Sequence, residues 1–471
     1  MIADLGPYPE YRESGLPWVG QVPEHWTLAP NRAMLRRRKV LVGKQHSDYK
    51  LLSLTKSGVI VRDISTGKGK FSADMGTSQE VRKGDLVFCL FDVPETPRTV
   101  GLSLHDGMIT GAYTVFECSD TLLASYLDSF YRSMDDRKLL SPLYSGLRNT
   151  IPPPRFLGTK TPLPPPDEQA AIVRFLNHAN QRIERTIRAK RKVIALLNEQ
   201  KQVIIHRAVT RGLDPNVRLK PSGIPWLGEV PEGWEIMQLR RVVSLVTSGS
   251  RGWAKYYCDA GDVFLQSGNL GRSMALNLSF IQHVKLPTGS EGIRTKVVED
   301  DLLVCITGAL TGNVVHVDID IPAAYVNQHV ALVRPRCNMV YPRFLAYLLR
   351  SNAGQSQFKT SEYGGTKQGL GLGDVKSIFV ALPSIELQQQ MSAALDAQIT
   401  QFDIPISRTE REISLLREYR TRLIADVVTG KLDVREAAAQ LPDDTDNFVI
   451  TNDLDNPFFE EGEDDGTATE E

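Results

Sequence analysis

Basic and amide side chains gather in several short polar stretches of the chain, many of them rich in the glycine and serine that are typical of loops. Arg and Lys neutralise phosphate groups, and Arg, Lys, Asn and Gln form hydrogen bonds with the edges of nucleobases. The candidates for such contacts in the first half of the chain are Arg36, Arg37, Arg38, Lys44, Lys56, Lys68, Lys70, Arg148 and Asn149. Those in the second half are Arg251, Trp253, Lys255, Gln266, Asn269, Arg272, Lys367 and Gln368.

The strongest pair among these candidates is Arg148 and Lys367. They lie in two matched segments, YSGLRNTI at 144–151 and YGGTKQGL at 363–370, and both follow a glycine-containing loop that lets the backbone approach a ligand closely. An exposed Arg or Lys is more often simply solvated, but the matched positions favour base contacts by this pair. A further basic row comprises Arg174, Arg182, Arg185, Arg188, Arg191 and Lys192. For this row, a solvated face or a protein-docking surface is favoured over phosphate contacts.

Residue patterns that carry out reactions are missing from the sequence. There is no Asp/Asn/Ser-Pro-Pro-aromatic motif of an amino-methyltransferase, and DNPFF at 455–459 lacks the second proline. STGKGK at 65–70 lacks the first glycine and the final Ser or Thr of a phosphate-binding loop. HExxH, GxSxG and a nuclease-like carboxylate cluster are also absent. We therefore expect no catalytic residues, no metal site and no cofactor on this chain.

The net charge of −1 conceals a basic body and an acidic end. Residues 442–471 contain 12 acidic residues and no Lys or Arg, which leaves 55 basic against 44 acidic residues elsewhere. A basic body is compatible with nucleic acid. The acidic segment is poor in apolar residues and is predicted to be a disordered, solubilising tail. An alternative is that it competes with DNA for basic surfaces, which unchanged DNA affinity at low salt after deletion of 442–471 would contradict.

The chain carries no pattern of a membrane or secreted protein. It has no apolar run long enough to span a bilayer, and its start lacks the basic-then-apolar layout of a signal peptide. The five cysteines, Cys89, Cys118, Cys258, Cys305 and Cys337, are scattered, with neither metal-ligand nor disulfide spacing. We expect reduced, mostly buried thiols, a cytoplasmic location and no membrane partner.

Two long helices are predicted at 167–210 and 386–429, aligned at an offset of 219 residues. Apolar residues recur at steps of three and four, from Ile172 to Ala208 in the first and from Met391 to Val427 in the second. A helix of this length spans about 60 Å, so its stripe needs an equally long partner. We expect the two to pair as an antiparallel coiled coil, with a kink near Pro405 because proline lacks a backbone donor.

The regions before the helices also repeat. SGLPWVGQVPEHW at 14–26 returns as SGIPWLGEVPEGW at 222–234, and its composition predicts an irregular strap anchored by two tryptophans. A mixed block with short strands follows each strap, including the matched strands GDLVFC at 84–89 and DDLLVC at 300–305. Helices are predicted near the end of each block, at 122–134 and 341–352. The straps and the long helices are thus similar in both copies, whereas the two mixed blocks have diverged.

Together these features predict an α+β chain with an internal repeat. The expected segments are a strap at 1–26, a first block at 27–162, a helix at 163–214, a second strap at 215–234, a second block at 235–382, a second helix at 383–440 and the tail at 441–471. Antiparallel pairing of the helices would give a pseudo-twofold arrangement. Such an object could contact two different half-sites about one turn of DNA, or 34–36 Å, apart.

The order of these motifs resembles the specificity (S) subunits of type I restriction–modification systems. The similarity rests on the straps, on LPPPDEQ at the start of the first helix and on VTRGLD and VTGKLD at the helix ends, and covers the chain to about residue 440. Two positions depart from the pattern: Leu387 stands where the first copy has Glu168, and Arg211 where the second has Gly430. These departures concern local capping contacts of the helices.

The resemblance implies a target recognition domain in each block and a helical spacer that sets the gap between two halves of a double-stranded DNA target. It also implies two modification subunits, which use S-adenosylmethionine to methylate adenine N6, and restriction subunits, which use ATP and Mg²⁺. Two other classes remain open. A structural scaffold with two protein-binding domains would show little salt-dependent DNA affinity. A self-sufficient enzyme would methylate DNA without partners.

Overall fold

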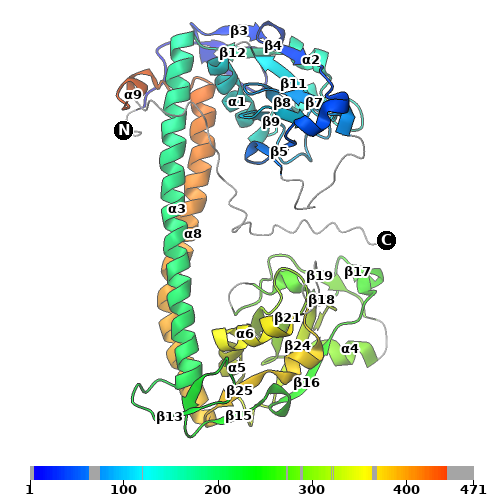
Figure 1. The fold of residues 1–471 in the computed structure, drawn as a ribbon, viewed down its shortest axis with the longest axis vertical. Helices are drawn as coiled ribbons and strands as arrows, with labels where there is room; N and C mark the ends of the chain where they lie inside the picture. Colours follow the sequence, from blue (N-terminus) through cyan, green and yellow to red (C-terminus); the bar gives the residue numbers. More distant parts are fainter. Residues whose placement is uncertain are drawn as a thin grey trace. The chain divides into compact units, whose positions relative to one another are not determined.

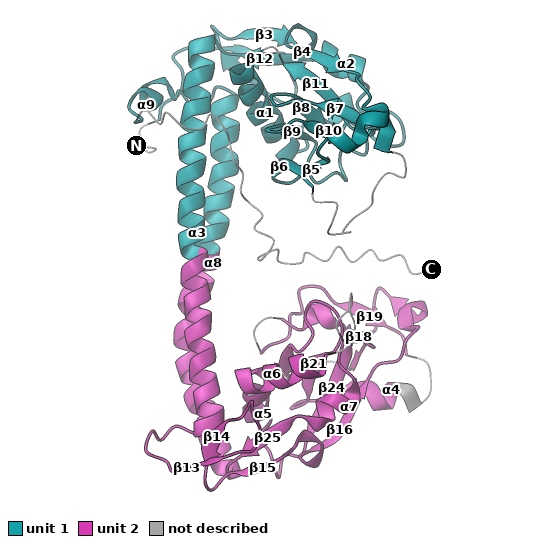
Figure 2. Cartoon of the chain, viewed as in Figure 1, with its two compact units in different colours: residues 1–190, 411–471 teal, residues 191–410 magenta. Residues whose placement is uncertain are grey.

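The computed structural model describes residues 5–62, 75–118, 120–271, 274–286, 290–319, 321, 323–362 and 369–442. The predicted acidic tail lies outside these residues, except for its first two positions. The chain divides into two compact units, unit 1 comprising 1–190 and 411–471 and unit 2 comprising 191–410 (Figure 2). Each unit therefore contains one mixed block and parts of both long helices.

Unit 1 is built on an antiparallel four-stranded sheet with the order β4-β11-β8-β9. Its strands are Leu35–Arg38 (β4), Thr114–Cys118 (β11), Leu86–Phe88 (β8) and Val100–Leu102 (β9). Helix α1 (Thr121–Asp136) begins where the Asp120 side chain accepts a hydrogen bond from the amide of Leu122. It covers the sheet (Figure 1). Tyr126, Phe130 and Tyr131 therefore share one core with Phe88 and Phe116.

Smaller elements complete unit 1. Strands β3 (Thr27–Pro30) and β12 (Lys160–Leu163) form a pair that leads from the first strap and into the long helix. Two further antiparallel pairs are β5 (Leu52–Thr55) with β6 (Gly58–Val61) and β7 (Gln79–Val81) with β10 (Gly107–Ile109). Short helices are α2 (Pro153–Gly158) and α9 (Arg435–Ala439).

Unit 2 contains an equivalent four-stranded main sheet and, in addition, a five-stranded sheet. The sheet β16-β24-β21-β22 has the same order as that of unit 1 and consists of Val243–Ser248, Val330–Pro335, Leu302–Cys305 and Val314–His316. A five-stranded sheet, β17-β19-β18-β23-β20, consists of Tyr257–Cys258, Gln282–Val284, Asp262–Leu265, Ala324–Val326 and Lys296–Val297. The pair β15 (Glu235–Gln238) and β25 (Phe379–Leu382) corresponds to β3 and β12.

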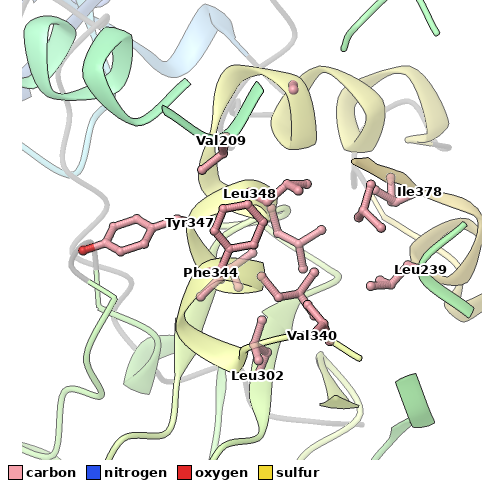
Figure 3. Packing of buried hydrophobic residues seen from close by; sticks show 14 of the residues in the cluster. Val209, Leu239, Leu302, Val340, Phe344, Tyr347, Leu348 and Ile378 are labelled. Carbon is pink, nitrogen blue, oxygen red and sulfur yellow. The ribbon is translucent and has the colours of Figure 1, made fainter. Parts of the chain in front are cut away.

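Helices cover the main sheet of unit 2. They are α5 (Pro342–Arg350), α6 (Asn352–Ser361) and α7 (Leu372–Ser377), whereas α4 (Ser290–Thr295) lies beside β16 and β23. Figure 3 shows Phe344 and Leu348 of α5 gathered with Val340 near Leu302 of β21. All four are fully buried and belong to the same hydrophobic cluster as Val209 of the first long helix. The predicted matched strands 84–89 and 300–305 are confirmed as β8 and β21.

The two predicted long helices are α3 (Pro166–Arg211) and α8 (Ile385–Val428). Ile172, Leu176, Ile183 and Ile187 of α3 are buried, as are Met391, Leu395, Ile406, Ile413 and Leu423 of α8. One position departs from the predicted stripe, because Gln398 is exposed and its neighbour Ile399 is buried. Helix α8 continues through Pro405. The kink expected there stays a prediction.

The two helices contact each other within each unit. In unit 1, Lys190 of α3 is 2.6 Å from the Glu412 carboxylate of α8, and Arg420 lies 3.6 Å from Glu184. In unit 2, Lys201 pairs with Asp403 at 2.5 Å. Within unit 1, the later of these two α3 residues therefore contacts the earlier of the two α8 residues.

The straps are more regular than expected. Each contains a short antiparallel hairpin, β1 (Tyr11–Glu13) with β2 (Gln21–Pro23) in unit 1 and β13 (Leu219–Pro221) with β14 (Glu229–Pro231) in unit 2. The prediction of two anchoring tryptophans was wrong for the second strap and only partly right for the first. Trp26 and Trp234 are buried, whereas Trp18 is half-buried and Trp226 is 42% exposed.

Each strap packs against the end of a long helix, but not always the helix nearest in sequence. The second strap places Trp234 against the α3 end, in one cluster with Ala208 and Val209. The first strap places Trp26 against the α8 end, with Val427 and Val428. The residues after α8 continue this contact, because the Asp433 amide donates to the Gly6 carbonyl at 2.9 Å. The segment after α8 thus contacts the first described residues of the chain.

Candidate nucleic-acid interface

In both units the polar loops gather at one end of the main sheet, which we name the loop end. It is the end where β8 and β21 finish and where β11 and β24 begin. The last residues of the two matched closing segments are held there in the same way. Ile151 donates its amide to the Leu90 carbonyl at 2.8 Å, and Leu370 donates to the Ile306 carbonyl at 2.9 Å. Equivalent hydrogen bonds therefore place Ile151 and Leu370 just after the corresponding strands β8 and β21.

Arg148 is presented by a rigid turn at the loop end of unit 1. The backbones of Ser145 and Thr150 exchange two hydrogen bonds of 2.9 and 3.0 Å across the base of the turn. The Arg148 guanidinium forms a two-pronged ion pair with Asp92, with its Nε 3.1 Å from Oδ1, and lies over the Phe91 ring. Arg148 lowers the pKa of the Asp92 carboxyl through these hydrogen bonds. Its side chain is still 70% exposed, so it is accessible to a ligand.

Asp92 occupies a left-handed backbone conformation with φ of 45°, and Asn149 has φ of 44°. Such conformations are uncommon for residues other than glycine. The position that matches Asp92 in unit 2 is Gly308, with φ of 95°. Unit 1 thus carries a carboxylate where the backbone would favour glycine, and this carboxylate holds Arg148. Lys367 and Gln368 lie outside the described residues, as do Lys68, Lys70 and Arg272.

The other predicted residues of unit 1 have different surroundings. Arg36 and Arg37 of β4 and Lys44 in the following turn are exposed, and Lys56 is exposed in the β5–β6 turn. Arg38 is only 10% exposed, because its Nε lies 2.8 Å from the buried Asp85 carboxylate. Arg38 therefore stabilises the sheet, and its guanidinium is not presented to a ligand as the sequence had suggested. Burial raises the pKa of Asp85 despite this partner.

In unit 2 the glycine- and serine-rich loop at 249–252 belongs to the loop end. Gly249 donates its amide to the Asn327 carbonyl at 3.0 Å, and a Cβ at Gly249 would clash with the Val326 carbonyl oxygen at 2.1 Å. Arg251 and Lys255 are exposed, and the Lys255 ammonium lies 4.9 Å from the Tyr256 ring centre. A close backbone approach therefore fixes this basic loop.

Two predicted residues of unit 2 are structural. Trp253 is 3% exposed and its ring is stacked on Phe264, with centres 5.3 Å apart, so the prediction that it contacts nucleic acid is wrong. Asn269 is 7% exposed and its amide group is used within the protein, which excludes it as a base reader. Gln266 is half-buried and donates to the Tyr257 hydroxyl at 3.3 Å.

The sequence did not single out Arg294, an exposed residue of α4. Its guanidinium donates to the Thr247 hydroxyl at 2.9 Å and to the Ser250 hydroxyl at 3.4 Å. It therefore lies beside the 249–252 loop and adds a positive charge there. Arg294 is remote from this loop in sequence and follows no glycine motif, so only the tertiary structure reveals the pairing.

The basic row on α3 borders a hollow in unit 1. His178, Gln181, Arg182, Arg185 and Pro442 line a space of about 450 Å³. Arg174 donates to the carbonyls of Leu441 and Pro442 at 2.7 and 3.0 Å. This hollow lies on α3, whereas the loop-end residues lie on the mixed block.

In the described part of the chain, no group of His, Cys, Asp or Glu side chains has a metal-binding arrangement, and no helix is long and apolar enough to cross a membrane. Cys89 and Cys305 are buried free thiols, and Cys337 is an exposed free thiol.

Comparison with known proteins identifies a related domain. Residues 231–413 match the family model described as the type I restriction modification DNA specificity domain. The type I restriction enzyme MjaVIII specificity subunit of Methanocaldococcus jannaschii is 26% identical over 286 residues, which are 59% of this chain and 64% of that protein. The EcoBI specificity subunit of Escherichia coli is 24% identical over 58% of each chain. The matches thus span about three-fifths of these relatives.

A solved structure shares the fold. A chain from a study of complex assembly and conformational transition of the type I R-M system has a TM-score of 0.57 and 15% identity, and the match covers 86% of this chain and 98% of that one. This match extends over both mixed blocks, whereas the family model covers part of the chain.

Proposed function

From the membership of residues 231–413 in the type I restriction modification DNA specificity family, we propose that this chain is the DNA specificity subunit of a type I restriction–modification complex. Each unit reads one half of a bipartite double-stranded target with the side chains at its loop end. The observation that carries this proposal is the repetition, in unit 1, of the β16-β24-β21-β22 order found within the matched region.

The different side chains at the two loop ends support recognition of a different base sequence by each unit. Unit 1 offers Arg148 on a turn fixed by Asp92, and unit 2 offers Arg251, Lys255 and Arg294 around a glycine-rich loop. Arginine can form two hydrogen bonds to the guanine edge in the major groove. Because the polar side chains differ while the sheets correspond, the two units read different base sequences.

The long helices set the spacing between the halves. We infer an antiparallel coiled coil and a pseudo-twofold repeat, with support from the buried stripes and from the Lys190–Glu412 and Lys201–Asp403 ion pairs. Exposed polar faces of α3 and α8 dock two modification subunits.

Catalysis resides in the partners of this chain. The modification subunits bind S-adenosylmethionine and transfer the methyl group to adenine N6, and restriction subunits bind ATP and Mg²⁺. This chain contributes the choice of site. The proposal agrees with the sequence, which contains no methyltransferase or nucleotide-binding motif.

A methylation map of host DNA tests this proposal. Deletion of the gene should remove one bipartite adenine-N6 methylation pattern, and its return on a plasmid should restore that pattern. An unchanged map would contradict the function. Loss of a pattern with a single uninterrupted target would contradict the division of reading between two units. A protein-binding scaffold would leave the map intact and show little salt-dependent DNA affinity.

A further inference from the structure

One large aromatic side chain at the loop end of unit 2 is almost completely exposed. Phe280 is 87% exposed, whereas its neighbours Leu278 and Ile281 are 36% and 38% exposed. A single ring therefore protrudes from the segment. Burial of a whole phenylalanine ring against a ligand would be favourable, because it removes a large apolar area from water.

The backbone that carries Phe280 is firmly held. The buried Asn269 side chain donates to the carbonyls of Asn277 and Phe280 at 3.0 and 2.8 Å. The Asn277 amide donates back to the Asn269 carbonyl at 2.8 Å, and the Asn269 side-chain oxygen accepts from the Gln266 amide at 2.9 Å. Asn269, which is buried and contacts no base itself, thus fixes this segment and positions Phe280.

Phe280 is among the polar loops of unit 2. It precedes β19, which lies beside β18, with Gln282 opposite Phe264 (Figure 1). The start of β19 is therefore next to the end of β18, from which Gln266 follows. Leu265 accepts the amide of Asn327, whose carbonyl in turn accepts the amide of Gly249. Phe280 and Gln266 thus lie at an end of the five-stranded sheet that Asn327 joins to the basic 249–252 loop of the main sheet.

Unit 1 has an apolar counterpart. Leu147 is completely exposed at the tip of the closing turn, between Gly146 and Arg148. The paired backbones of Ser145 and Thr150 hold this turn. Leu147 in unit 1 and Phe280 in unit 2 are thus strongly exposed apolar side chains on backbones held by hydrogen bonds.

We propose that Phe280 and Leu147 are apolar wedges that contact the bases of double-stranded DNA, each within the half-site read by its own unit. Apolar side chains inserted at a base step partly unstack it and read its deformability. The inference rests on the proposed function, since it assigns a specificity role within that reading. DNA is favoured over a protein partner because Leu147 precedes the exposed Arg148 and Phe280 lies near Gln266 and the loop that carries the exposed Arg251, whereas protein interfaces centre on broader apolar surfaces.

The test uses the chain assembled with its modification subunits and the duplex identified by the methylation map. Phe280→Ala should reduce target affinity by about tenfold to a hundredfold, the range for removal of one aromatic–base stack. Its salt dependence should stay unchanged because no phosphate contact is lost. Phe280→Trp should retain binding. Val298→Ala is the matched control, because Val298 is 41% exposed and lies before β21, at the opposite end of the sheet.

Local unstacking is measured with 2-aminopurine placed at successive positions of the duplex. The wild-type complex should raise its fluorescence at a step in one half-site, and Phe280→Ala should abolish only that signal. Leu147→Ala should weaken the response of the other half-site. Wild-type affinity and fluorescence in Phe280→Ala would overturn the inference. If that variant assembles poorly, normal DNA binding by the fraction that does assemble would also overturn it. Absence of specific binding by the wild-type complex would overturn the proposed function as well.

Discussion

The two units hold an equivalent buried aspartate in different ways. In unit 1, Asp85 before β8 pairs with Arg38 of the edge strand β4. In unit 2, Asp301 before β21 pairs with Arg334 of the central strand β24. By strand register the position of Arg334 corresponds to Glu117 in unit 1, and that of Arg38 corresponds to Thr247 in unit 2. The aspartate is thus retained while its arginine has moved to a neighbouring strand.

This difference separates the buried aspartate, which has the same structural role in both units, from the arginines, whose positions differ. The buried carboxylate accepts a hydrogen bond from a nearby amide in both units, from Arg82 in one and Val298 in the other, so it fixes the turn before the strand. The arginine can come from any strand within reach. Basic residues on the sheets therefore cannot be assigned to DNA from their type alone, and the Arg38 prediction failed for this reason.

The largest expected effect comes from breaking the ion pair of unit 1. Arg38→Ala leaves the Asp85 carboxylate, 4% exposed, without its partner and should destabilise unit 1 by about 3–5 kcal/mol in urea unfolding. Arg334→Ala should cost less, because the Arg334 side chain is 32% exposed. The double variant Arg38→Thr/Glu117→Arg recreates the arrangement of unit 2 and should recover most of the loss. No recovery would contradict the equivalence of the two sheets.

A second comparison concerns the start of each long helix. Glu168 of α3 is buried and accepts hydrogen bonds from Trp26 Nε1 and His25 Nε2, each at 2.8 Å, and from the Tyr8 hydroxyl. The corresponding Leu387 of α8 is 36% exposed. Glu168→Leu, which copies unit 2 into unit 1, leaves two buried donors unpaired and should cost about 2–4 kcal/mol. Leu387→Ala is the control and should change the urea midpoint little.

A third, smaller change tests the reader itself. Arg148→Ala should lower the affinity for the target by about tenfold to a hundredfold if the guanidinium reads a base. The loss should fall on one half-site only, as seen in binding to duplexes substituted in either half. An equal loss for all sequences with a smaller salt slope would instead indicate a phosphate contact. Equal affinity and methylation in the variant would remove Arg148 from the site.

The smallest change is Asp92→Gly, which gives unit 1 the glycine found at Gly308. It relieves the left-handed φ of Asp92 and removes an exposed ion pair, so the melting temperature should change little. DNA affinity should fall less than in Arg148→Ala, because the guanidinium remains but is no longer held. A loss as large as that of Arg148→Ala would show that Asp92 does more than hold Arg148.

The sequence predicted the helices and strands better than it predicted which of them pack together. The period of the apolar residues located α3 and α8, and the matched strands and closing segments appeared as repeats, because these signals are local. The packing of the first strap on the α8 end could not be predicted, since Trp26 and Val427 are far apart in the chain. Trp253 and Asn269 were misassigned because residue type does not reveal burial, and Phe280 was missed because an isolated aromatic residue usually belongs to a core.

The proposed division of DNA reading between two units joined by a helical spacer is tested most directly by lengthening that spacer. Two helical turns, about seven residues or about 10 Å, would be inserted in both α3 and α8 between the Lys190–Glu412 and Lys201–Asp403 pairs. The methylation map should then show a gap about three base pairs longer between unchanged half-sites. Altered bases within either half, or methylation at the original gap, would contradict the account.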